Sequence, residues 1–79
     1  MYLLFDVFGR RMSVKRVGEE WQLFRDSESG LRARVYDVVI PADLAQTQLS
    51  RYLADLYHEW ASERHPGVTW LNPPSDGED

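Results

Sequence analysis

Short runs of apolar or alternating residues, separated by turn residues, fill the first forty positions of the chain. The turn signals contain Gly9, Gly18 and Gly30. The runs between them cover residues 2–8, 11–17, 21–25 and 31–40. In the second run, Met12 and Val14 alternate with polar neighbours, which is typical of a strand with one buried side. Because the loops are short, we expect the runs to pair in sequence as an antiparallel meander.

After Pro41 the period of the apolar positions changes from two to three or four. The apolar positions of this segment are Leu49, Leu53, Leu56 and Trp60, with Tyr52 beside them. This spacing predicts an amphipathic helix that begins at Asp43 or a few residues later, because Asp43 and Gln46 have the spacing of a capping box. The helix should end before His65-Pro66. Val68–Leu71 is rich in strand-forming residues and predicts a last, short strand beside the meander.

These elements predict an α+β fold. We expect an antiparallel β-meander of three to four strands, one long amphipathic helix packed on one face, and a short C-terminal strand. A chain of 79 residues has room for one hydrophobic core, so residues 1–72 should form a single domain. Residues 73–79 are acidic and contain no apolar side chain beyond the prolines, which predicts a disordered tail.

One helix can cover only one face of such a sheet. If Leu3, Phe5 and Val7 face the helix, the opposite face combines aromatic and basic side chains. The predicted binding residues on this face are Tyr2, Leu4, Phe8, Arg11, Lys15, Arg32, Arg34 and Tyr36. Such a face has three interpretations: an ordinary solvated surface, a contact with a protein partner or a second copy, and a platform for single-stranded nucleic acid.

Charge is distributed unevenly along the chain. Residues 1–36 carry a net charge of +2 and residues 37–79 carry −6, which gives −4 for the whole chain. This net charge opposes general affinity for nucleic acid. An alternative function is therefore an acidic inhibitor or regulator of a nucleic-acid-handling or host-defence complex. Its carboxylates would be Asp55, Glu59 and Glu63, with Asp76, Glu78 and Asp79 of the tail.

Few residues have the spacing that catalysis requires. The chain has no Cys, and His58-Glu59 lacks the second His that a zinc protease helix needs, because position 62 is Ser. A looser set of Asp55, His58, Glu59 and His65 is too sparse to predict a metal site. The sequence has no phosphate-binding glycine loop and no serine nucleophile elbow. We therefore expect a protein that is not an enzyme and that has no metal or cofactor.

The sequence also predicts the location of the protein and the kind of partner that it binds. The first residues lack the basic start of a signal peptide, and no apolar run is long enough to span a bilayer. We expect a cytoplasmic protein without membrane contact. A protein partner or a homodimer is the expected interaction, with nucleic acid as the weaker alternative, because 13% of the residues are aromatic and such residues are enriched at interfaces.

Three segments together resemble a family. They are Phe5–Arg11 (FDVFGRR), Val39–Leu44 (VIPADL) and Tyr52–Ala61 (YLADLYHEWA), the last followed by Pro66-Gly67-Val68. This combination is similar to a small bacterial family of domains of unknown function that spans nearly the whole chain. The resemblance implies a bacterial or phage origin and a compact α+β domain. It implies no catalytic or binding residue.

Overall fold

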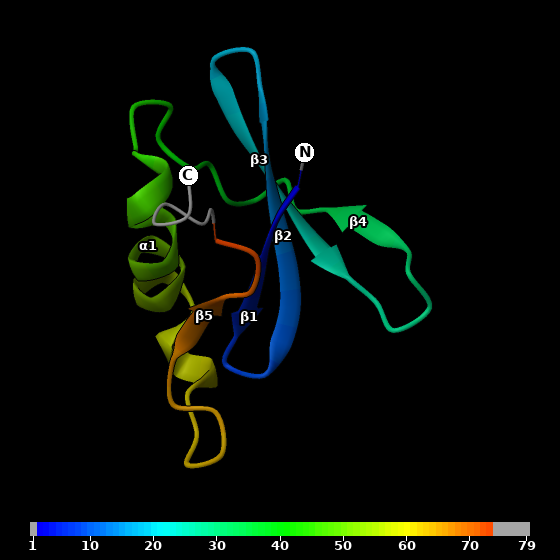
Figure 1. Ribbon diagram of the computed structural model, residues 1–79, viewed down its shortest axis with the longest axis vertical. Coiled ribbons are helices and arrows are strands. Elements are labelled where there is room, and N and C mark those ends of the chain that lie inside the picture. The colour runs from blue at the N-terminus through cyan, green and yellow to red at the C-terminus, as the bar shows by residue number, and fades with distance from the viewer. Residues whose placement is uncertain (1, 74–79) are drawn as a thin grey trace, which may run out of the picture.

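Five antiparallel strands form one sheet in the order β4-β3-β2-β1-β5. The computed structural model describes residues 2–73, so residues 74–79 of the predicted tail lie outside the described part. The meander strands are β1 (Tyr2–Val7), β2 (Arg10–Val17), β3 (Glu20–Asp26) and β4 (Arg32–Arg34). They are followed by a 3₁₀ turn η1 (Gln46–Gln48), helix α1 (Leu49–Leu56), a second 3₁₀ turn η2 (His58–Trp60) and strand β5 (Val68–Trp70). This arrangement confirms the predicted α+β fold (Figure 1).

Two tight turns set the register of the central strands. Phe8 and Gly9 have φ values of 51° and 90° and join Val7 to its partner Arg10, as in a type I′ hairpin turn. Gly18, with φ 62°, begins the second two-residue turn, between β2 and β3. Positive φ is strained for most residues, so these turns depend on glycine.

The core lies between the sheet and the helix. Leu3 and Phe5 of β1 pair with Val14 and Met12 of β2, and all four are buried on the same face. Leu49 and Leu53 of α1 are also fully buried, and the helix packs over β5 and β1 (Figure 1). The odd-numbered residues of β1 therefore face the helix, which is the condition under which the binding residues on the opposite face were predicted.

The segment after β4 differs from the prediction of one strand over residues 31–40, because β4 ends at Arg34. After this point the chain leaves the sheet edge and crosses to the helix side, where Val35 and Ile40 are buried. Three side chains hold the crossing segment by its carbonyl groups. Arg16 donates to Ala42 O at 2.8 Å, Trp21 Nε1 to Leu44 O at 3.0 Å and Tyr52 Oη to Val39 O at 3.2 Å.

The helix is shorter than its apolar period indicates, and its predicted cap is wrong. Asp43 makes no capping contact; instead the Gln48 side chain accepts a hydrogen bond from the Ala45 N–H at 3.0 Å. At the other end, Tyr57 has φ −112° and ψ 25° and interrupts the α-helix. The following 3₁₀ turn aligns residues three apart, which stacks the rings of Tyr57 and Trp60 at 4.3 Å.

The predicted last strand is confirmed. Hydrogen bonds of the Asn72 side chain, which we call the clasp, add to its pairing with β1. β5 pairs antiparallel with β1, and Trp70 stacks on Phe5 with ring centroids 5.8 Å apart. Asn72 Oδ1 accepts hydrogen bonds from the Leu4 N–H (2.7 Å) and from Trp70 Nε1 (3.1 Å). Its Nδ2 donates to Tyr2 O at 3.1 Å. The Asn72 side chain thus bonds to the β1 backbone just beyond the last residue of β5.

Gly9→Ala tests the close approach of the His65 ring to the first turn. A Cβ at position 9 would lie 2.7 Å from Cδ2 of His65, whereas a Cβ at Gly30, which has the same φ of 90°, meets nothing within 4 Å. Gly30→Ala, the matched control, should lose roughly 1–2 kcal/mol from positive φ alone. Gly9→Ala should lose about 0.5–1.5 kcal/mol more, because the His65 ring must move. Urea unfolding measures both. Equal losses, or an excess that persists in a His65→Ala background, would contradict the packing argument.

Phe8→Asn tests whether backbone strain or burial of the ring dominates the stability at the same turn. Asn adopts positive φ more readily than Phe, which should recover about 1 kcal/mol. The Phe8 ring is only 7% exposed and belongs to the core, and losing a buried Phe costs about 3–5 kcal/mol. We therefore expect net destabilisation of about 2 kcal/mol or more by thermal or urea unfolding. A variant as stable as the parent would show that strain dominates.

Candidate binding face

The sheet face opposite α1 has no helix or strand of the described residues packed on it (Figure 1). Strand alternation and register determine which side chains it carries: Tyr2 lies opposite Lys15, Asp6 opposite Arg11, and Phe24 opposite Arg34. We call this surface the open face. Its members are Tyr2, Leu4, Asp6, Arg11, Ser13, Lys15, Gln22, Phe24, Asp26, Arg32 and Arg34.

Aromatic rings and cations alternate across the open face. The rings of Tyr2 and Phe24 meet edge to face, with centroids 5.5 Å apart. The Arg32 guanidinium lies 3.9 Å from the centre of the Tyr2 ring, and Lys15 Nζ lies 5.2 Å from the same ring. Arg34 lies 5.9 Å from the ring centre of Phe24 and 5.0 Å from that of Tyr36. Each such contact is worth about 0.5–1 kcal/mol at an exposed site, so together they hold these side chains in place.

A polar network lies beneath the rings. Ser13 is fully buried, and its Oγ donates to Asp26 Oδ1 at 3.0 Å and accepts from Arg32 Nε at 3.1 Å. Arg32 Nε also lies 3.2 Å from Asp26 Oδ1. A buried hydroxyl must be hydrogen-bonded to avoid a desolvation cost, and here both of its roles are used. The network therefore fixes the base of the open face.

Arg34 is held less completely. Its Nη2 lies 3.3 Å from Glu20 Oε2, and Gln22 donates to the same oxygen at 3.3 Å. Arg34 Nε is buried and has no hydrogen-bond partner among the described residues. An unsatisfied buried donor costs about 1–3 kcal/mol, and such groups are rare in native proteins.

Most predicted binding residues come together on this surface. Tyr2, Leu4, Arg11, Lys15, Arg32 and Arg34 lie on the open face, and Tyr36 follows β4 with its ring against Arg34. Phe8 does not lie there, which corrects its predicted position. Its positive φ in the turn ends the strand alternation and directs its ring into the core.

The predicted binding residues did not include Phe24 and Ser13, which also lie on the open face. The signal was present, since the two-residue turn at Gly18 places Ser13 opposite Phe24, and Gln22 alternates with Leu23. The ion pairs of Arg32 and Arg34 depend on β4 pairing with β3 through a longer loop. The length of that loop does not specify a register.

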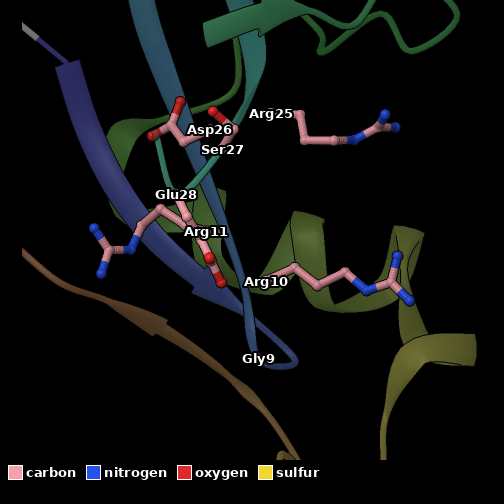
Figure 2. A pocket seen from close by; sticks show the side chains of 7 residues that line it. All are labelled: Gly9, Arg10, Arg11, Arg25, Asp26, Ser27 and Glu28. Atoms are coloured by element: carbon pink, nitrogen blue, oxygen red, sulfur yellow. The ribbon is translucent and has the colours of Figure 1, made fainter. Parts of the chain in front are cut away.

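A second cluster lies where β2 begins and β3 ends. A pocket of about 600 Å³ is lined there by Gly9, Arg10, Arg11, Arg25, Asp26, Ser27 and Glu28. Figure 2 shows Arg10 and Arg25 extending to one side of the strands and Arg11 to the other. The Arg10 guanidinium stacks on the Trp60 ring at 4.0 Å. Asp26 and Glu28 offset two of the three positive charges of this pocket, so its charge gives little attraction for an anion.

Tyr57 lies close enough to this cluster for charges to act on it. Burial is the main cause that raises the pKa of the Tyr57 phenol above its ordinary value of 10.0. The Asp37 carboxylate raises that pKa further, and the Arg25 guanidinium lowers it. The neutral phenol is therefore the form that the fold favours.

The acidic residues predicted for an inhibitor or regulator lie outside the sheet. Asp55 in α1, Glu59 in η2 and Glu63 in the following loop are all exposed. His58 Nδ1 lies 3.2 Å from Asp55 O, whereas the His65 ring lies over Gly9. Within residues 2–73, no three His, Asp or Glu side chains lie close enough together to hold a metal ion. No helix in the same range is long and apolar enough to cross a membrane.

Residues 2–72 match the model of a protein family described as a domain of unknown function, DUF7661. The chain belongs to this family. The match runs from the first residue of β1 to Asn72, so it includes every strand of the sheet and the clasp that closes it. No curated protein and no solved structure matches the chain.

Asp37→Asn and Arg25→Ala should shift the pKa of Tyr57 in opposite directions. Removing the carboxylate should lower this pKa, and removing the guanidinium should raise it further. Because the pKa is raised on folding, the associated stability is present below pH 10 and is lost as the pH rises through the folded-state pKa. NMR titration of the Tyr57 ring measures the shift, with Asp43→Asn as the control carboxylate. Shifts of the same sign would contradict this electrostatic account.

Proposed function

We propose that this domain is a non-catalytic protein-binding module of bacterial or phage origin that acts in the cytoplasm. Its binding surface is the open face together with Tyr36. The observation that carries the proposal is the row of rings and cations from Lys15 to Tyr36, which no other described element covers. Tyr and Arg are the residue types that most often supply binding energy at interfaces.

The preordered side chains favour binding of a folded or extended protein partner. Ordering a flexible side chain on binding costs about 0.5–1.5 kcal/mol, and here contacts within the domain already hold Tyr2, Arg32 and Arg34. The unpaired Nε of Arg34 adds a donor that a partner carbonyl or carboxylate would satisfy after a small side-chain movement.

The same contacts make single-stranded nucleic acid the less favoured ligand. Bases stack on free ring faces, but Arg32 and Lys15 already lie over Tyr2. Asp26 and Glu20 neutralise Arg32 and Arg34, so these two residues keep local hydrogen-bond donors but lack the net positive charge that a run of phosphates requires. The net charge of −4 acts in the same direction.

Arg11→Glu and Tyr36→Ala test the proposal in a pull-down with the tagged full chain from a nuclease-treated bacterial lysate. Both residues are exposed, so the variants should fold. We expect one stoichiometric protein whose recovery falls about tenfold in each variant, as for a loss of about 1.4 kcal/mol. Arg51→Glu makes the same charge change on the exposed side of α1 and should retain the partner.

Three results would contradict the proposal. Recovery that disappears with nuclease would indicate nucleic-acid binding, and equal losses in Arg11→Glu and Arg51→Glu would show that net charge matters rather than the open face. An empty eluate together with a monomer in analytical ultracentrifugation would rule out both binding of a protein partner and formation of a homodimer. Salt dependence of a captured complex would separate charged from aromatic contacts.

A further inference from the structure

Strand β4 presents an unpaired backbone edge. It pairs with β3 on one side, and no other element of the described residues packs against it. The Ser27 N–H donates to Leu31 O at 2.9 Å and the Val35 N–H to Leu23 O at 2.9 Å, so residues 31 and 35 bond back toward β3. In an antiparallel pair, alternate residues turn their polar groups outward. The N–H and C=O groups of Arg32 and Arg34 therefore point away from the sheet.

Exposed apolar side chains occur just before and just after this edge strand. Leu31, Tyr36 and Val39 are 73%, 78% and 82% exposed, and no large hydrophobic among the described residues is more exposed. Leu31 directly precedes β4 and Tyr36 follows it by two residues, whereas Val39 lies in the segment that crosses to the helix side. The remaining exposed large hydrophobics reach only 39–42%. Apolar area concentrated at a free edge is typical of a site that another strand covers.

The two sides of the edge differ in chemistry. Arg32 and Arg34 lie on the open face, and Ala33 lies on the opposite side. Each guanidinium bonds one carboxylate oxygen of its own chain and has further N–H groups for a second acceptor. An added strand would therefore meet positive charge on one face and a small apolar residue on the other.

A second copy of this chain does not fit the edge well. Antiparallel pairing of two β4 strands centred on Ala33 would set Arg32 of one copy directly opposite Arg34 of the other, twice in each dimer. Like charges in directly opposite positions are destabilising. The charge pattern of the edge therefore favours pairing with a strand whose sequence differs from that of β4.

We infer that β4 accepts an extended segment of a protein partner in which acidic and apolar residues alternate. Backbone hydrogen bonds to Arg32 and Arg34 would extend the sheet by one strand, and the partner's carboxylates would lie beside the two guanidinium groups. The apolar residues would lie beside Ala33, on the face opposite the two guanidinium groups. This inference rests on the proposed function, because the added strand continues the open face.

Amide hydrogen exchange by NMR tests the inference with a capped peptide of alternating Glu and Val. The peptide should slow the exchange of the Arg32 and Arg34 amides about tenfold at saturation and leave those of Val14 and Leu23 unchanged. The matched peptide of alternating Lys and Val should not slow them. Arg34→Glu should weaken binding of the Glu peptide about tenfold, whereas Arg51→Glu should leave it unchanged.

Each alternative outcome has a definite meaning. Binding that leaves the Arg32 and Arg34 amides unprotected, no binding of the Glu peptide, or equal protection by the Lys peptide would overturn the inference. Protection that rises with protein concentration alone would assign the edge to a second copy, which also overturns it. If the pull-down partner is lost in Arg11→Glu while the Glu peptide fails, the proposed function stands and only the edge inference fails.

Discussion

The register between β1 and β2 is the constraint on which the remaining structure depends. It places Leu3 against Val14 and Phe5 against Met12 on the helix side, and Tyr2 against Lys15 on the open face. Side chains alternate with a period of two, so a slip by one residue would exchange these faces. The core under α1 and the row of rings and cations would both be lost. The Phe8-Gly9 turn prevents the slip, because its two positive φ values fit only a two-residue loop at this point.

Packing and polar contacts then divide the sheet into two unlike faces. The helix side is closed by α1 and by the segment after β4, which Arg16, Trp21 and Tyr52 hold by its carbonyl groups. Among the described residues, only its own side chains cover the open face, with Ser13 and Asp26 beneath the rings. Ion pairs at this exposure contribute little stability singly, so their main effect is to orient Arg32 and Arg34.

Local pattern was sufficient to predict most of the fold and part of the binding face. Met12 and Val14 alternate with polar residues, and the glycine turns are short, so strand pairing and the buried set followed from periodicity. Three features did not follow from periodicity: the early end of β4, the break at Tyr57 and the inward ring of Phe8. The end of β4 depends on the crossing to the helix side, and the direction of the Phe8 ring depends on the core. The break at Tyr57 accompanies the stack of its ring on Trp60, a contact that the apolar period does not signal. The Asn72 clasp is a single side chain with no periodic signal.

That clasp has a consequence for the order of folding. It joins Leu4 and Tyr2 to a residue 68 and 70 positions further along the chain, whereas the hairpins of β1 to β3 join neighbouring segments. Closing a long loop costs more chain entropy than closing a tight turn. During synthesis the meander can form early, but the outer edge of β1 stays unpaired until β5 and Asn72 have left the ribosome. Until then the outer edge of β1 is open to pairing with other chains, and the three residues of β5 together with Asn72 then cover it.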